Sequence, residues 1–408
     1  MQFSESVEIH GHLMDSGILA RVLDDVLGYG GDYRIDRIDI GKQHEDESRA
    51  TLTVSAEDDE GLQRLLMRLQ THGVNQVDPG QALTRPCERD GVFPDDFYST
   101  TNLETVVRLG SSWVPVEHPE MDCGLVVTDG HVRTVPVSDV AAGDEVVCGA
   151  GGVKVVLPPV ERSGDTFEFM SSAVSSEKPQ ALLVRQIAER MREVKEVGQK
   201  VLWVGGPGIV HTGAAPAFTA LVDAGYVDVL FAGNALATHD IESALYGTSL
   251  GVDLAQGKGV EHGHEHHIRA INTIRRAGSI ATAVEEGVLT SGIMHALVKQ
   301  QKTFVLVGSV RDDGPLPDVY TDVIEGQRAM RAELPGVGFA IMVATMLHSI
   351  ATGNILPASV PLVCVDINPA TVTKLADRGS AQAVGIVTDI GLFLEQLARE
   401  LVPSYSGA

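Results

Sequence analysis

The feature that most constrains the fold of this chain is an apolar, strand-like run that ends in a glycine-rich turn. Residues 201–213 read Val-Leu-Trp-Val-Gly-Gly-Pro-Gly-Ile-Val-His-Thr-Gly, and a helical pattern follows. Glycine lets backbone N–H groups approach an anion closely, and the first turn of the next helix offers unpaired donors. The run therefore predicts a nucleotide phosphate site at the end of a strand, with a plain strand-to-helix turn as the alternative.

The spacing of the glycines narrows the kind of nucleotide site. Gly206-x-Gly208 is followed by His211 at the place where the usual dinucleotide fingerprint has a third glycine. The turn also lacks the Lys-Ser/Thr pair of a P-loop, which argues against a nucleotide triphosphatase.

Alternating helices and apolar strands surround the turn. Helices are predicted at 180–197 and 216–224, and strands at 200–204, 227–232, 303–307 and 360–365. Strands that are apolar throughout are buried on both faces, so this alternation predicts a parallel sheet covered by helices on both sides. We expect an α/β, Rossmann-like domain over residues 171–408.

Two smaller parts precede that domain. Residues 1–85 show the order strand, helix, strand, strand, helix, strand, which is typical of a ferredoxin-like α+β module. Residues 86–170 contain short strand patterns between turn pairs such as Asp129-Gly130 and Gly151-Gly152, which predict a small β-rich middle unit.

Composition and charge exclude several classes of protein. The formal net charge of −24 repels phosphate, so nucleic acid and anionic membranes are not expected partners, whereas a cationic substrate suits it. The four cysteines form no C-x-x-C pair, which argues against a zinc site and a disulfide framework. Without a signal-peptide pattern or a run of about 18 apolar residues, the sequence predicts a cytoplasmic protein.

Polar residues follow three of the predicted strands, and ligands of open parallel sheets bind beyond these carboxyl ends. They are Asn234 and Asp240, then Arg311, Asp312 and Asp313, and finally Asp366. Asn234 and Asp240 are candidates to face a ligand, with a helix cap at Thr238 or Asp240 as the alternative, and the group around Asp312 either acts on a ligand or forms a solvated loop. Asp366 ends its strand as a ribose-binding carboxylate does, but far beyond the roughly 20 residues of the standard unit.

Two further segments are rich in side chains of the types that bind ligands or metals. Residues 261–267, Glu-His-Gly-His-Glu-His-His, hold the densest set of metal-capable side chains, yet their spacing matches no ligand signature, so we expect no metal site. Residues 90–102, Asp-Gly-Val-Phe-Pro-Asp-Asp-Phe-Tyr-Ser-Thr-Thr-Asn, are too polar for a core and too aromatic for a linker. This loop is either functional or a strap that joins domains.

The motifs together resemble a known family. Residues 1–85 with the 90–102 loop resemble the conserved region named for lysine-oxoglutarate reductase and saccharopine dehydrogenase. The remaining motifs resemble archaeal-type ornithine cyclodeaminases and the C-terminal half of cyanobacterial arginine dihydrolase/ornithine cyclodeaminase fusions; they are Gly205-Gly-Pro-Gly208, His211-Thr-Gly213, Gly233-Asn-Ala235, Val365-Asp-Ile-Asn368 and Lys374-Leu-Ala-Asp-Arg-Gly379.

The resemblance implies a bound NAD, a nucleotide domain akin to deoxyhypusine synthase, and conversion of L-ornithine to L-proline and ammonia. The cofactor would take a hydride from ornithine and return it after ring closure, with no net redox change. By matching motif positions, the NAD phosphates are expected on Gly206, Gly208, Thr212 and Gly213. The adenosine and ribose are expected near Asn234, Ala235, Asp253 and Asp366. Met346 and Leu347 either line the cofactor or belong to the core of an apolar helix.

The substrate amines start as ammonium ions and must lose protons, so a general base is required. Candidates are Asp240, Asp312 and Asp313, with Asp95 and Asp96 in a loop that closes over the substrate. Substrate contacts are expected from Thr101, Asn102, Arg311 and Lys178, and one of the last two would pair with the carboxylate. A homodimer or homotetramer is the default assembly.

Three other functions remain open from the sequence. An NAD-dependent amino-acid dehydrogenase of saccharopine or lysine type would accumulate NADH. A non-catalytic sensor would bind NAD and an amino acid without turnover. A metal-dependent enzyme would use His262, His264, His266 and His267.

Overall fold

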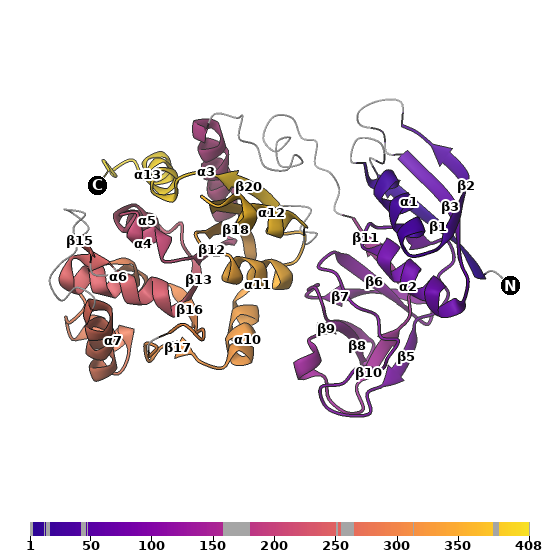
Figure 1. Ribbon diagram of the computed structural model, residues 1–408, viewed down its shortest axis with the longest axis horizontal. Coiled ribbons are helices and arrows are strands. Elements are labelled where there is room, and N and C mark those ends of the chain that lie inside the picture. The colour runs from indigo at the N-terminus through magenta and orange to yellow at the C-terminus, as the bar shows by residue number, and fades with distance from the viewer. Residues whose placement is uncertain are drawn as a thin grey trace. The chain divides into compact units, whose positions relative to one another are not determined.

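The computed structural model describes residues 3–11, 13, 17–41, 46, 48–157, 180–249, 252–253, 265–312, 314–377 and 383–407. The chain forms two compact units (Figure 1). Unit 1 comprises Met1–Phe167 and Asn354–Ser359, and unit 2 comprises Glu168–Gly353 and Val360–Ala408.

Unit 1 begins with the predicted ferredoxin-like module. Its elements are β1 (Phe3–Gly11), α1 (Ile18–Gly28), β2 (Asp32–Asp39), β3 (Ser48–Ala56), α2 (Asp59–Gln70) and β4 (Asn75–Gln76). The sheet has the order β2-β3-β1-β4 with antiparallel neighbours, which is the ferredoxin-like arrangement. Helix α2 begins where the Asp58 side chain accepts a hydrogen bond from Gly61 N, and its leucines are buried, as its apolar spacing predicted.

The β-rich part of unit 1 is one seven-stranded sheet. Its strands are β5 (Leu83–Pro86), β6 (Glu104–Leu109), β7 (Ser112–Glu117), β8 (Gly124–Thr128), β9 (His131–Val135), β10 (Glu145–Cys148) and β11 (Val153–Val156), with a 3-10 turn η1 (Val137–Asp139). The order is β11-β6-β7-β9-β8-β10-β5. Gln70 Nε2 donates to Val153 O over 2.8 Å, so this sheet is hydrogen-bonded to α2. The two N-terminal domains predicted from the sequence therefore share one compact unit.

Unit 2 is built on a seven-stranded parallel sheet. Its strands are β12 (Lys200–Gly205), β13 (Val229–Gly233), β16 (Thr303–Val307), β17 (Val319–Tyr320), β18 (Val337–Val343), β19 (Leu362–Asp366) and β20 (Ala383–Val387). The order is β17-β16-β13-β12-β18-β19-β20, and every neighbouring pair is parallel. Apart from β17, this is the doubly wound Rossmann order, and the direction of winding reverses between β12 and β18. The predicted Rossmann-like domain is confirmed.

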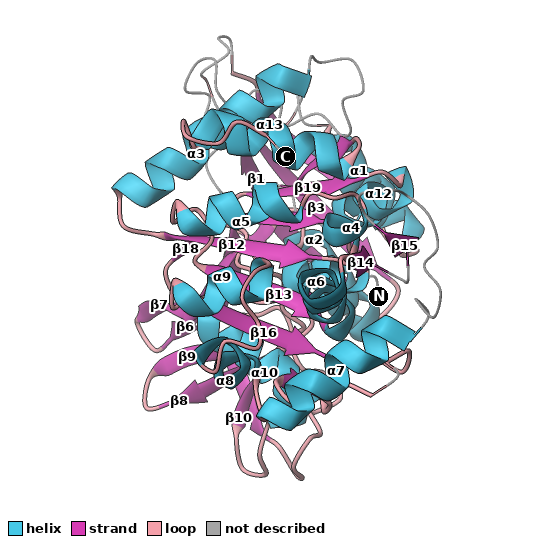
Figure 2. Ribbon diagram, turned by 90° about the vertical axis from the view of Figure 1, so that its left-hand side faces the viewer, coloured by secondary structure: helices cyan, strands magenta, loops and turns pink. Residues whose placement is uncertain are grey.

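Helices cover this sheet, and a short hairpin accompanies them. They are α3 (Gln180–Glu196), α4 (Gly208–His211), α5 (Ala215–Asp223), α6 (Asn234–Tyr246), α7 (His266–Ala277), α8 (Ile280–Glu285), α9 (Ile293–Lys299), α10 (Val323–Glu333), α11 (Leu347–Ile355), α12 (Pro369–Asp377) and α13 (Ile390–Leu401), with the hairpin β14 (Thr248–Ser249) and β15 (Val252–Asp253). In Figure 2, strands β18, β12, β13 and β16 run side by side, with α5 and α9 in front of them. The core contains Trp203 and Ile341 from the sheet, with Phe218 and Phe393 from the helices.

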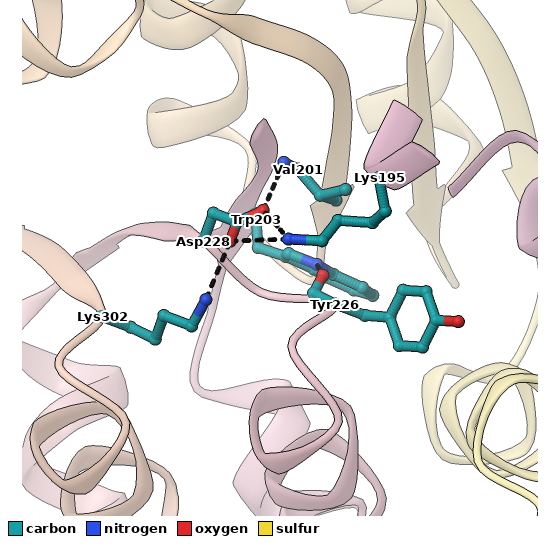
Figure 3. Close-up of polar contacts among 6 residues, drawn as sticks. All are labelled: Lys195, Val201, Trp203, Tyr226, Asp228 and Lys302. Carbon is teal, nitrogen blue, oxygen red and sulfur yellow. Dashed lines mark hydrogen bonds and ion pairs between the residues drawn. The ribbon is translucent and has the colours of Figure 1, made fainter. Parts of the chain in front are cut away.

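A charged cluster joins the carboxyl end of α3 to the amino ends of β12, β13 and β16 (Figure 3). Asp228, just before β13, accepts hydrogen bonds from Lys195 Nζ of α3 at 3.0 and 3.1 Å, from Lys302 Nζ at 2.8 Å and from Val201 N at 2.9 Å. Burial alone raises the pKa of Asp228, but these hydrogen bonds outweigh it and hold the pKa below its ordinary value. The cluster fixes the amino edge of the sheet and leaves the opposite, carboxyl edge for a ligand.

Strand β18 was not predicted from the sequence. Its run Val-Gly-Phe-Ala-Ile-Met-Val is apolar at every position, and such a run does not distinguish a buried strand from a buried helix. In the part of the chain that the structure describes, no helix combines the length and apolar character needed to cross a lipid bilayer.

Candidate active site

The strand register aligns one row of residues at the carboxyl edge of the unit 2 sheet. Gly205 of β12 lies opposite Ala232 of β13 and Val343 of β18, and Val343 lies opposite Val365 of β19. The next residue in each strand or turn therefore stands at the same edge; these are Gly206, Gly233, Ala344 and Asp366. The edge includes the switch point between β12 and β18, where ligands of open α/β sheets bind.

The glycine turn passes the end of β18 without room for a side chain. Gly206 N donates to Val343 O over 2.9 Å, and a Cβ on Gly206 would lie only 1.8 Å from Ala344 O. A Cβ on Gly208 would lie 2.9 Å from Ala344 Cβ. This close packing against the end of β18 requires glycine at both positions, and the turn leads directly into α4, whose amino end is the kind of place where a dinucleotide phosphate binds.

Thr212 and Gly213 lie beyond the turn, at the end of α4. Thr212 Oγ1 donates to Gly208 O over 2.8 Å. Both residues line a cavity of about 510 Å³, whose other walls include Asp389, Gly391 and Arg399 at helix α13. Of the four residues expected on the NAD phosphates, Gly206 and Gly208 thus lie at the switch point, whereas Thr212 and Gly213 lie beside α13.

Asn234 and Asp366 stand on opposite sides of the switch point. Asn234 Oδ1 accepts hydrogen bonds from Leu316 N at 3.0 Å and Thr238 Oγ1 at 3.3 Å, and Asp366 Oδ1 accepts one from Asn368 N at 2.8 Å. Strands β13 and β19 are three strand spacings apart, about 14 Å. The expectation that both residues lie near the adenosine and ribose stays a prediction. Ala235 follows Asn234 in α6, and the side chain of Asp253 lies outside the described residues.

Met346 and Leu347 follow β18 at the same edge. Leu347 begins α11 and is 74% exposed, so the core interpretation of this residue is wrong. Met346 Sδ lies 3.9 Å from Lys374 Nζ. An exposed apolar side chain beside the glycine turn is a candidate contact for a cofactor ring.

His348, the next residue, was not identified from the sequence. Its Cε1 lies 3.1 Å from the position that a Cβ on Gly233 would occupy, and the carbonyl of Val307 acts on its ring. Burial lowers the pKa of His348, and the Val307 carbonyl and Asp312 only partly oppose this effect. In the sequence, His348 follows closely after an apolar run. That position indicates a ligand site only if the run is a strand, and the sequence alone does not show this.

Asp312 and Arg311 lie in the loop after β16. Asp312 Oδ2 accepts a hydrogen bond from Ser309 N at 2.8 Å, and Arg311 N donates to Ser309 Oγ over 3.2 Å. The structure thus places Asp312 at the carboxyl edge near His348. Asp313 and Lys178 lie outside the described residues.

Asp240 is placed as a helix cap. Its two oxygens accept hydrogen bonds from Ile293 N and Met294 N, each at 2.8 Å, at the start of α9. Burial raises the pKa of Asp240 to about 6, although the two N–H donors favour the charged form. With both oxygens occupied and 1% of the residue exposed, a general base at Asp240 has no geometric support among the described residues.

The remaining substrate candidates lie in unit 1, where the 90–102 loop is bound to its surroundings. Asp96 Oδ2 pairs with Arg85 over 3.2 Å, and Asp95 is exposed. Asn102 is buried and donates from Nδ2 to Leu356 O over 3.1 Å, and Thr101 Oγ1 accepts from Leu103 N over 3.3 Å. These contacts favour the strap interpretation of the loop. The contributions of Asp95, Asp96, Thr101 and Asn102 to substrate binding stay predictions.

The histidine-rich segment contributes to a hydrogen-bond network in unit 2. His239 Nδ1 lies 2.9 Å from Glu242 Oε2, Thr248 Oγ1 donates to Glu242 Oε1 over 2.9 Å, and His266 Nδ1 lies 2.8 Å from Thr248 Oγ1. No group of three or more His, Cys, Asp or Glu side chains is placed to hold a metal ion within the described ranges, and His262 and His264 lie outside them. The network joins α6, the β14–β15 hairpin and the beginning of α7.

A doubly wound parallel sheet with a glycine turn at its switch point defines a dinucleotide-binding α/β protein. Three families match successive parts of the chain. They are the LOR/SDH bifunctional enzyme conserved region over residues 4–103, the first region of the arginine dihydrolase ArgZ-like C-terminal part over 104–184, and the ArgZ-like C-terminal Rossmann fold over 185–397.

Several proteins that are similar to this chain are named ornithine cyclodeaminase. The chain is 54% identical to the ornithine cyclodeaminase of Methanothermobacter thermautotrophicus, over 98% of each chain. It is 49% identical to that of Methanocaldococcus jannaschii, over 98% of this chain and 96% of the other. The chain therefore belongs to the archaeal-type ornithine cyclodeaminase family, as its motifs predicted.

Solved structures agree with this assignment. The apo structure of ArgZ, an arginine dihydrolase of cyanobacteria, matches with a TM-score of 0.86 and 38% identity, over 98% of this chain and 58% of that chain. The ternary complex of AgrE with ornithine and NAD+ matches with a TM-score of 0.54 and 41% identity, over 99% of this chain and 59% of that chain.

Proposed function

We propose that this protein is an NAD-dependent ornithine cyclodeaminase, which converts L-ornithine into L-proline and ammonia. The observation that carries this proposal is the switch-point turn, where Gly206 has no room for a side chain, in a chain 54% identical to an ornithine cyclodeaminase over 98% of each. A relative that was solved with ornithine and NAD+ supports both ligands.

The residues at the carboxyl edge fit such a cofactor. When bound, NAD supplies the capacity to accept a hydride and to return it, so that the overall reaction involves no net redox change. The backbone at Gly206 and Gly208 would hold its phosphates. Asn234 on one side of the switch point and Asp366 on the other would contact different parts of it, and Leu347 would cover one of its rings.

The substrate is a small cation with a carboxylate. The net charge of −24 attracts it to the protein, and the Arg311 guanidinium at the carboxyl edge is our candidate partner for its carboxylate. The α-amine must lose a proton before it can form an imine, so a proton acceptor is needed at the same edge. Asp312 and His348 are two described titratable groups that lie close together at that edge.

Incubation of the purified protein with L-ornithine and a small amount of NAD tests the function. We expect proline and ammonia in equal amounts over many turnovers per NAD, with no accumulation of NADH. NADH formed in proportion to consumed ornithine would instead identify an amino-acid dehydrogenase. Tight NAD binding without turnover of any basic amino acid would identify a sensor.

We also propose that the enzyme assembles as a homodimer or homotetramer, since closed symmetric assemblies are the commonest form of oligomeric enzymes. The molar mass in solution, measured by light scattering, tests this assembly; a monomer at micromolar concentration would contradict it.

A further inference from the structure

His348 lies over the ends of two strands that it does not follow in the chain. It is the second residue of α11, after β18, yet its ring stands beside Gly233 at the end of β13 and the carbonyl of Val307 at the end of β16. Its Cε1 is 3.1 Å from the place of a Cβ on Gly233, so a side chain there would press on the ring. The imidazole is therefore held at the carboxyl edge, in the row that also contains Gly206.

The contacts of the ring determine its chemical state. A neutral imidazole has one donor and one acceptor nitrogen. A carbonyl only accepts, so the Val307 carbonyl favours the tautomer whose proton faces it, which leaves the other nitrogen as the acceptor. Burial disfavours the imidazolium and lowers the pKa of His348, so the ring is neutral at neutral pH.

One carboxylate is placed to stabilise the charge that proton uptake would create. Asp312 acts electrostatically on His348 and is itself oriented by Ser309 N at 2.8 Å. On the other side, Lys374 of α12 lies 3.9 Å from Met346 Sδ, two residues before His348. A histidine beside an oriented carboxylate is the arrangement that general-base catalysis uses.

We propose that His348 is the general base of this enzyme and accepts the proton that the α-ammonium group of ornithine loses. The inference rests on the proposed function and assigns a role that it leaves open. The ammonium N–H bond breaks, its electron pair stays on the substrate nitrogen, and a new N–H bond forms on the free imidazole nitrogen. The proton returns when the amine leaves as ammonia, so the ring is unchanged after each turnover.

Two other carboxylates at or near this edge already bind backbone N–H groups. Both oxygens of Asp240 cap α9, and Asp366 is 8% exposed and accepts from Asn368 N. Asp312 is a positioning residue, because it acts through the charge on His348.

The variants His348→Asn and His348→Gln test the proposal, since each keeps an amide donor for Val307 O in one of the two possible ring orientations and neither accepts a proton. We expect kcat/KM for ornithine to fall by about 10²- to 10⁴-fold in both variants, and the acidic limb of its pH profile to disappear. NAD affinity, measured by calorimetry, should stay unchanged, which shows that the cofactor site at the carboxyl edge is folded.

Two further variants are needed: Asp312→Asn tests the positioning role of Asp312, and His131→Gln is the control. Without the Asp312 charge the pKa of His348 should fall further, so the acidic limb should move to lower pH while kcat decreases. His131, whose side chain is 74% exposed in unit 1, should be replaceable without effect.

The outcomes separate the two proposals. If the parent protein makes no proline, the proposed function fails before the variants are compared. If the parent is active and both His348 variants keep kcat/KM within tenfold with the acidic limb in place, His348 is not the base and the function stands.

Discussion

At the turn between β12 and α4, the backbone just after β18 already occupies the space beside Gly206. A Cβ there would lie 1.8 Å from Ala344 O, which is far inside any van der Waals contact. Alanine at this position requires either the turn or the end of β18 to move. Because the phosphates are expected to meet these same backbone groups, one methyl group should disturb both the packing and the ligand site.

Gly206→Ala should therefore weaken NAD binding by at least about tenfold, and overpacking should cost about 1 to 3 kcal/mol of unfolding free energy. Isothermal titration calorimetry and urea unfolding measure the two effects. Gly28→Ala is a matched control, because nothing lies within 4 Å of a Cβ there. Unchanged NAD affinity in Gly206→Ala would contradict a phosphate site at this turn.

Single residues of the site differed in how well the sequence predicted them. Gly206 and Gly208 are marked by local chemistry, because a turn of this kind needs glycine whatever surrounds it. Asp240 looked like a base from its place after a strand, but the two N–H groups that it binds belong to α9, a later part of the chain. No local pattern indicates a role for His348, because its neighbours, Gly233 and Val307, lie at the ends of other strands.

At the scale of elements, Asp228 connects α3, β12, β13 and the beginning of β16. Its side chain is 15% exposed, so its hydrogen bonds to two ammonium groups and one N–H are shielded from water. The pKa of Asp228 lies below its ordinary value in the folded protein. Its stabilisation is therefore complete above the unfolded-state pKa of about 4 and is lost as the pH falls through the folded-state value.

Asp228→Asn should lower the unfolding free energy at neutral pH by about 2 kcal/mol. The difference between parent and variant should shrink as the pH falls below about 4, because the parent then loses the same charge. Urea unfolding at a series of pH values measures both. Asp129→Asn, in an exposed turn with φ of 50°, should have no effect, since Asn tolerates this conformation. A constant difference at all pH values would contradict the charge argument.

At the scale of the whole molecule, the net charge of −24 produces self-repulsion in the folded state. Salt screens exposed charges over about 10 Å at 0.1 M, so added sodium chloride should stabilise the fold. We expect the apparent Tm to rise by a few °C, on the order of 1 to 2 kcal/mol, between low and moderate salt. Differential scanning fluorimetry measures this shift. A Tm that falls over the same range would contradict net repulsion.

The sequence by itself determined which segments become strands and helices in most of the chain, the ferredoxin-like and Rossmann-like classes, and the glycine turn. These follow from local physics, since the period of apolar residues and the demands of tight turns act over a few residues. The tertiary structure alone decided that β18 lies beside β12, that Asn234 and Asp366 stand on opposite sides of the switch point, and that His348 meets Gly233. Such pairings depend on contacts between distant parts of the chain, so a local pattern cannot specify them.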